Sequence, residues 1–346
     1  MKKLFSGSSV GLLLCAAILL VGGCRTVTQV QPAPVSTGPT TSLPSAGIVG
    51  IQPGTASGNS GDFEIDLFVV DSNGHALTNL SPSAISMVTA VDTTFSQTSV
   101  GTTTSAACGS YSAELLLDQT GSILTTDPLN LRLIAAKIFL EATSLLPNAD
   151  EVQLSTFQDS LHLGFYMQSY GAFTHNTGAF IDTVALLASR VAGGTPLYDA
   201  MYNEVDSLTM NAHNANKVLI VFTDGEDNES GLYYPGATLW STIHHAISEH
   251  VKVFAIALQT GLDTALISAA MQTGGAVMHT NDAKQMVSYF GALPSLAQGG
   301  TEYYQTKWHV SLPHAASLSG QMVSGNLSIT LPDNTTVLAP FAVTFP

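Results

Sequence analysis

The sequence predicts an α/β fold: a doubly wound, mostly parallel sheet in the middle of the chain, flanked on both sides by β segments. From residue 111 to about residue 298, apolar strand runs alternate with amphipathic helix patterns, which is typical of parallel sheets covered by helices. Apolar residues alternate with polar ones from Phe63 to Val69 and again from Trp308 to Leu312, as in half-buried strands. A chain of 346 residues, 45% of them hydrophobic, is long enough to bury such a fold.

Residues 1–23 predict a signal peptide. Lys2 and Lys3 precede an apolar run at residues 11–21, which is too short to span a membrane. The small residues before Cys24 resemble a bacterial lipobox, and this resemblance implies a lipidated Cys24 that anchors the protein to a membrane of the bacterial cell envelope. Arg25 replaces the aspartate that usually retains lipoproteins at the inner membrane, so in a cell with two membranes we expect the outer one. An ordinary secretory signal is the alternative.

Residues 24–47 predict a tether between the anchor and the folded body. Four prolines lie among Ser, Thr and Gln without apolar periodicity, a composition that favours an extended linker. We expect Cys15 to be removed with the signal and Cys24 to be acylated, which would leave no cysteine to form an intramolecular disulfide with Cys108. We expect it to pack as a small hydrophobic side chain beside a strand, the alternative being an intermolecular disulfide.

The charge balance excludes nucleic acid as a partner. The chain has 10 Lys and Arg residues against 25 Asp and Glu residues, a formal net charge of -15. A protein that binds a phosphate backbone needs clustered basic residues to displace counterions, and no such cluster is present.

The first loop with candidate metal ligands follows a short buried strand at residues 113–117. It runs Asp118-Gln-Thr120-Gly-Ser122 and offers one carboxylate and two hydroxyls just beyond the strand, at the edge where open α/β sheets bind ligands. Asp127 and the proline after it predict the N-cap and first residue of a helix over residues 131–146.

Two further loops add oxygen ligands. Thr195 lies in a Gly-Gly-Thr-Pro turn before a helix, and Asp224 follows a second buried strand at residues 218–222. All five side chains carry hard oxygen donors, and no His or Cys accompanies them. Such a set favours Mg²⁺, with Mn²⁺ or Ca²⁺ as alternatives, over zinc or copper.

These three pieces, in this order, resemble the metal-ion-dependent adhesion site of the von Willebrand factor A domain, over about residues 109–298. The resemblance implies a six-stranded, Rossmann-like sheet with one short antiparallel edge strand, which we place at residues 160–165. It also implies that Asp118, Thr120, Ser122, Thr195 and Asp224 hold a divalent ion, directly or through water, and that a carboxylate of the partner completes the coordination. Thr120 departs from the commoner serine but keeps the hydroxyl.

The flanking β segments, residues 48–108 and 299–346, fit a more specific pattern. Residues 66–80 resemble the first strand of bacterial A-domain proteins in which a β-sandwich is built from chain on both sides of the A domain. The resemblance therefore implies a flanking β-sandwich-like domain made of both segments. Two unconnected β modules are the alternative.

No enzymatic motif is present. The chain lacks nucleophile-elbow, Walker and His-Glu-x-x-His patterns, and its densest histidine group, at residues 244–250, has the wrong spacing for a shared metal on a helix. We therefore expect a non-enzymatic lipoprotein that binds a protein or glycan ligand through the metal ion. The alternative is a structural or assembly scaffold of the envelope in which the ion is structural.

Overall fold

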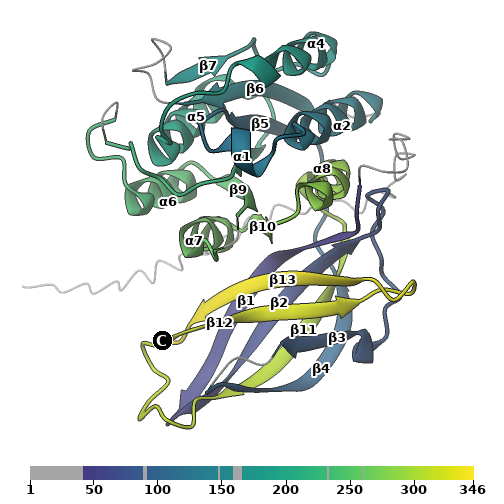
Figure 1. Cartoon of the computed structure of the whole chain (residues 1–346), viewed down its shortest axis with the longest axis vertical. Coiled ribbons are helices and arrows are strands. Elements are labelled where there is room, and N and C mark those ends of the chain that lie inside the picture. The colour runs from purple at the N-terminus through teal and green to yellow at the C-terminus, as the bar shows by residue number, and fades with distance from the viewer. Residues whose placement is uncertain (1–41, 89–91, 147–148, 159–165, 232–233, 260) are drawn as a thin grey trace, which may run out of the picture.

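The computed structural model describes residues 42–346 except 89–91, 147–148, 159–165, 232–233 and 260. Two bodies are joined in it: an α/β layer structure and a β-sandwich (Figure 1). Cys24, the signal peptide and most of the tether lie outside the described residues. Within the described part of the chain, no helix is long and apolar enough to cross a membrane.

A six-stranded sheet forms the centre of the α/β body, in the order β10-β9-β8-β5-β6-β7. All neighbouring pairs are parallel except β6 and β7. Its strands are β5 (Tyr111–Asp118), β6 (Glu151–Phe157), β7 (Met167–Ser169), β8 (Asn216–Thr223), β9 (Val251–Leu258) and β10 (Ala276–Thr280). The predicted fold class is confirmed. The antiparallel edge strand is β7, and the expected position at residues 160–165 lies outside the described residues.

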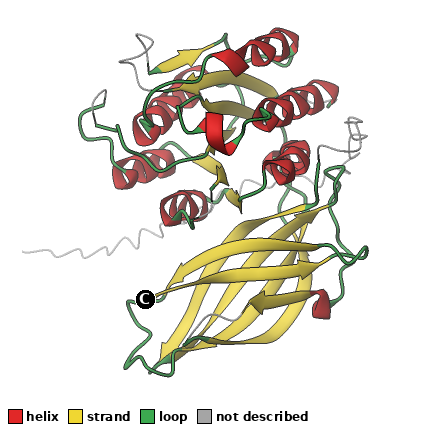
Figure 2. Cartoon of the chain, in the orientation of Figure 1, coloured by secondary structure: helices red, strands yellow, loops and turns green. Residues whose placement is uncertain are grey.

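Helices cover both faces of this sheet, which is why its central strands are almost entirely apolar and buried (Figure 2). One face packs against α2, α4 and α8, and the other against α5, α6 and α7. The helices are α1 (Ile123–Thr126), α2 (Leu131–Leu145), α4 (Gly178–Leu186), α5 (Leu197–Asn211), α6 (Leu239–Ser248), α7 (Thr264–Thr273) and α8 (Ala283–Gln298), with 3-10 turns η1 (Pro82–Ala84) and η2 (Leu187–Ser189).

The start of α2 differs from the prediction. Asp127 is not its N-cap, because the chain first forms the one-turn helix α1, and the N-cap of α2 is Asn130 with a φ of 55°. The Asp127 carboxylate nevertheless serves the helix, since it accepts hydrogen bonds from the backbone amides of Leu131 (2.7 Å) and Arg132 (3.0 Å).

The β-sandwich is built from both flanking segments. A four-stranded antiparallel sheet, β4-β11-β2-β1, packs on a three-stranded antiparallel sheet, β13-β12-β3. Phe63 of β2 stacks on Phe341 of β13, with ring centroids 5.5 Å apart. The strands are β1 (Ser45–Ser57), β2 (Ser60–Val70), β3 (Ile85–Val88), β4 (Thr94–Thr104), β11 (Glu302–Ser311), β12 (Met322–Thr330) and β13 (Thr336–Thr344).

Strand β1 joins the two bodies. Ile48 of β1 pairs antiparallel with Val277 of β10, so the four-stranded sheet continues the central sheet at its edge. The strand begins at Ser45, within the segment assigned to the tether from the sequence. Ser45 is buried and its hydroxyl lies 2.8 Å from that of Ser288 in α8, so the chain is already fixed to the α/β body here.

Candidate functional site

Asp118 is the last residue of β5, and its carboxylate is held by two donors. Its Oδ1 accepts a hydrogen bond from the backbone amide of Thr120 (2.7 Å), and its Oδ2 accepts one from the hydroxyl of Thr223 at the end of β8 (2.7 Å). The side chain is fully buried. Because β5 and β8 are adjacent and parallel, their carboxyl ends lie at the same sheet edge, and this carboxylate bridges them.

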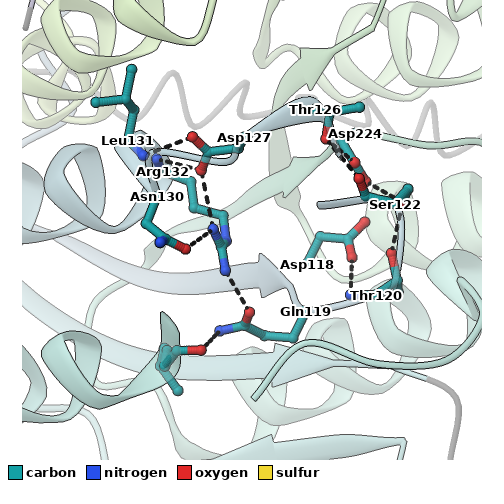
Figure 3. A network of polar contacts seen from close by, with 11 residues as sticks. Asp118, Gln119, Thr120, Ser122, Thr126, Asp127, Asn130, Leu131, Arg132 and Asp224 are labelled. Atoms are coloured by element: carbon teal, nitrogen blue, oxygen red, sulfur yellow. Dashed lines mark hydrogen bonds and ion pairs between the residues drawn. The ribbon is translucent and has the colours of Figure 1, made fainter. Parts of the chain in front are cut away.

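The two hydroxyls of the first loop meet Asp224 of the third. The Thr120 and Ser122 hydroxyl oxygens are 3.2 Å apart, and Ser122 donates a hydrogen bond to Asp224 Oδ1 (2.8 Å; Figure 3). The hydroxyl of Thr126 donates to the other oxygen of the same carboxylate. Helix α1 positions both donors, because it begins directly after Ser122 and Thr126 lies one turn later.

The loop before α5 brings Thr195 to the same place. The backbone amide of Gly121 in the first loop donates to the carbonyl of Gly193 (3.0 Å), and the backbone amide of Thr195 donates to the side-chain oxygen of Asn228 (2.7 Å). A Cβ atom placed on Gly225 would lie 3.7 Å from the Ser122 Oγ and 3.8 Å from the Thr195 Oγ1. Hydroxyls of two loops therefore border the same small space beside a glycine that leaves it open.

Two carboxylates in this space make it strongly electronegative. Burial, together with the charge of Asp224, raises the pKa of Asp118 to about 6. Burial also raises the pKa of Asp224, although hydrogen bonds from Thr126 and Ser122 lower it in part. Like charges that share a buried site oppose ionisation of each other, and a cation between them removes that penalty.

The structure thus brings together all five side chains that the sequence singled out. Asp118, Thr120, Ser122, Thr195 and Asp224 lie on three loops at the carboxyl end of β5, at the carboxyl end of β8 and before α5. The donor set consists only of carboxylate and hydroxyl oxygens, which fits a hard divalent ion such as Mg²⁺. Their role as metal ligands stays a prediction.

Two polar residues of the site were not identified from the sequence. Thr223 and Thr126 contact the two aspartates, yet each is an ordinary residue in its local sequence. A threonine four residues after Ser122 was the available signal for Thr126. Only the one-turn helix α1 brings the Thr126 hydroxyl to Asp224, and the apolar pattern did not predict this helix.

The other chemistry-bearing residues lie elsewhere. The ring of His245 stacks on Tyr202, with centroids 4.3 Å apart, and its Nε2 lies 2.8 Å from a carboxylate oxygen of Asp206, so it is partly packed. Cys108 is exposed, contrary to the prediction, because it lies in the segment between β4 and β5 with its sulfur 3.9 Å from the Lys252 ammonium. Among the described residues, no group of three or more His, Cys, Asp and Glu side chains could hold a metal.

The model of the von Willebrand factor type A domain family matches residues 115–292, about half of the chain. The chain belongs to this family. The match includes all three loops of the site and runs from β5 into α8. A search of curated proteins gives no match.

Solved structures of low identity are similar in fold. The chain is 12% identical to a von Willebrand factor type A protein from Catenulispora acidiphila (TM-score 0.46), over 89% of this chain and 74% of that one. It is 15% identical to proximal thread matrix protein 1 from the mussel byssus in a structure described with a zinc-occupied MIDAS motif (TM-score 0.42; 59% and 49%). It is 11% identical to the pilus adhesin SpaC from Lactobacillus rhamnosus GG (TM-score 0.46; 84% and 47%). The chain spans about half the length of the last two proteins.

Proposed function

We propose that this protein binds a protein or glycan ligand through a divalent ion, Mg²⁺ in the first place, held by Asp118, Thr120, Ser122, Thr195 and Asp224. The observation that carries the proposal is the meeting of three loops at one sheet edge in a von Willebrand factor type A domain. There the Ser122 hydroxyl bonds to Asp224 and, with the Thr195 hydroxyl, faces the space beside Gly225.

The five candidate ligands differ in charge, and this difference determines what each contributes to ion binding. The three hydroxyls are neutral, so the side chains offer only two negative charges, on Asp118 and Asp224. When bound, the ion supplies a local positive charge with coordination positions left for an outside ligand. The hydrogen bonds from Thr223 and from the Thr120 amide fix the Asp118 carboxylate in place. A site with so few charged ligands binds its ion weakly alone and more tightly with a carboxylate of the partner.

Such a site allows an acidic protein to bind an acidic partner. The chain has a formal net charge of -15, so its overall field repels carboxylate-bearing ligands. A bound divalent ion reverses the sign of the potential locally. Ligand capture therefore depends on the ion, and a chelator abolishes it.

We also propose that the protein acts at a membrane of the cell envelope. Lipidation of Cys24 and the Pro-rich segment after it would hold the domain at the surface of an envelope membrane, the outer one in a cell with two membranes. A Cys24→Ser variant should stay unprocessed or leave the membrane fraction. If it is processed and fractionates like the parent protein, the anchor is wrongly assigned.

Calorimetric titration with Mg²⁺ tests the site directly. The parent protein should bind Mg²⁺, and Asp118→Ala should lose this binding while it stays folded, because the site lies at the end of the sheet. Asp182→Ala is the matched control: it removes the same charge from an exposed position on α4 and should bind like the parent. Equal binding by parent and Asp118→Ala would mean that the ligands are wrongly assigned.

A scaffold with a structural ion is the second candidate, favoured by the large β-sandwich joined to the domain through β1 and β10. Capture of envelope proteins with and without EDTA separates the two functions. For a binding module, EDTA should abolish capture and leave the fold intact. For a scaffold, EDTA should either leave capture unchanged or unfold the protein.

A further inference from the structure

Arg132, in the first turn of α2, lies behind the candidate metal site. It is the one Lys or Arg residue with a fully buried side chain in the described part of the chain, at 0% exposure. Burying a guanidinium is unfavourable unless negative groups surround it. Its position in a chain with only 10 Lys and Arg residues therefore calls for a reason.

Its contacts run from α2 to the first metal loop (Figure 3). Nη1 donates to the Asp127 carboxylate (3.1 Å) and to the side-chain oxygen of Asn130 (2.9 Å), and Nη2 donates to the Gln119 side-chain oxygen (2.8 Å). Gln119 lies between the two candidate ligands Asp118 and Thr120 and is itself buried. Arg132 thus bonds directly to a residue of the first metal loop, between two candidate ligands.

The requirements of the helix do not explain this arginine. The Asp127 carboxylate already accepts backbone amides at the start of α2, at 2.7 Å and 3.0 Å, and those bonds need no guanidinium. The Nε of Arg132 has no hydrogen-bond partner among the described residues, so the group is not placed to satisfy all its donors. Burial lowers the pKa of Arg132, and the carboxylate of Asp127 and the charges of Asp118 and Asp224 raise it in part, so the arginine lies within the field of the candidate site.

We propose, on the basis of the metal site proposed above, that the buried charge of Arg132 sets the ion affinity of the site. In the ion-free protein its positive charge offsets part of the negative charge of Asp118 and Asp224. In the ion-bound protein the same charge opposes the ion. Binding of the ion is thereby kept weak until a partner carboxylate adds its own negative charge. Asp127 balances the arginine in turn, so the ion affinity depends on the sum of both charges.

The test is a double-mutant cycle of Arg132 and Asp127, in which Mg²⁺ affinity is measured by calorimetric titration. Arg132→Gln, which removes the charge and keeps a polar side chain, should tighten Mg²⁺ binding about tenfold, the effect expected of one unit charge close to a divalent ion inside a protein. Asp127→Asn should weaken binding by about the same factor, because the arginine charge is then unopposed. The double variant should return to within about threefold of the parent.

Controls separate charge from geometry. Lys137→Gln removes the same charge from an exposed position on the same helix and should leave the affinity unchanged. If Arg132 only held the loop in place, Arg132→Gln would weaken binding, and the double variant would be weaker still. Either result, or an unchanged affinity in all variants, overturns the proposal. Thermal unfolding in EDTA shows which variants are folded.

Three further outcomes are distinguished. If Arg132→Gln does not fold, Asp127→Asn against the double variant decides: a tenfold weaker single variant supports the proposal, and equal affinities overturn it. If the parent binds no Mg²⁺, the proposed metal site fails and this inference fails with it. If the parent binds Mg²⁺ and the variants do not follow the charge pattern, only the inference fails.

Discussion

Strand β5 carries two buried acids, four residues apart, each of which lies beside a second acid but in different surroundings. Asp118 at its end faces Asp224 from the loop after β8, and Glu114 in its middle lies close to Glu204 of α5. Burial raises the pKa of all four groups, and in each pair the second acid raises the pKa of the residue on β5. The two pairs therefore begin from the same electrostatic problem.

Their surroundings differ in hydrogen-bond donors and in access to solvent. Asp118 and Asp224 accept bonds from a backbone amide and three hydroxyls, and Ser122 beside them is exposed. The carboxylate oxygens of Glu114 and Glu204 accept no hydrogen bond from the described residues. Ser155 and Ser207 are near enough to lower the pKa of Glu204 in part, but Ser155 donates to Ser169 and Ser207 to Gln153.

A pair of buried acids does not by itself define a cation site. Donors that favour the charged form, and an opening through which an ion can enter, make a pair suitable for a metal. A pair without them, enclosed between a helix and a sheet, is stable only while it keeps a proton. The same strand thus provides an ion site at its end and a proton-holding pair at its centre.

Addition of Mg²⁺ should give the largest difference between the two pairs. At about 100 times its dissociation constant, an ion that binds only the folded state stabilises it by about 2.7 kcal/mol. Urea unfolding with Mg²⁺ and with EDTA should give this increment for the parent and for Glu204→Gln, and none for Asp118→Ala. Loss of the increment in Glu204→Gln would mean that the ion binds at the buried glutamates instead.

A rise in pH should act on the glutamate pair. The pKa of Glu204 in the folded protein is about 7, above its ordinary value of 4.5, so the folded state holds the proton more tightly than the unfolded state. The stability due to this group is present below pH 4.5 and is lost as the pH rises to about 7. Glu204→Gln should therefore be more stable than the parent by about 2 kcal/mol at pH 8 and nearly equal to it at pH 4.5.

Urea unfolding from pH 4.5 to 8 in EDTA measures this difference. Asp182→Asn, at an exposed acid on α4, is the matched control. A constant stability difference between Glu204→Gln and the parent across this range would contradict the interpretation that Glu204 holds a proton in the folded protein.

The sequence predicted the first pair and not the second, for a physical reason. Asp118 and Asp224 each follow a buried strand, and the carboxyl ends of parallel strands meet, so their proximity follows from topology. Glu114 stands inside an apolar strand, and Glu204 lies 90 positions later on a helix. Only the packing of α5 on β5 brings them together. Arg132 escaped prediction likewise, since a charged residue near a helix start is ordinarily exposed.

A buried acid of the β-sandwich should give a smaller effect in a lower pH window. Asp66 of β2 is 8% exposed, and burial, with the charge of Glu64, raises its pKa to about 6. Its stabilising contribution is present below its ordinary pKa of 3.8 and is lost as the pH rises through 6. Asp66→Asn should stabilise the protein at pH 7, by somewhat less than Glu204→Gln does at pH 8 because the pKa shift of Asp66 is smaller, with the change complete near pH 7 instead of pH 8. Urea unfolding over pH 4 to 8 measures it, and a gain that persists unchanged at pH 4 would exclude the titration of Asp66 as its cause.

The smallest expected effect concerns two buried tyrosine hydroxyls, which are uncharged and differ in whether they have a hydrogen-bond partner. The hydroxyl of Tyr289 in α8 is buried without a hydrogen-bond partner among the described residues, and its ring packs over Gly47 of β1. The hydroxyl of Tyr111 is equally buried but lies 2.8 Å from that of Thr143. Tyr289→Phe removes an unsatisfied group and should stabilise the protein by up to about 1 kcal/mol, whereas Tyr111→Phe should cost about 1 kcal/mol. Because the two substitutions remove the same atom from equally buried sites, urea unfolding of both at pH 7 isolates the hydrogen bond. Destabilisation of the same size by both would mean that the Tyr289 hydroxyl has a partner at the junction of α8 and β1, and that buried polar groups there are satisfied as fully as at the metal site.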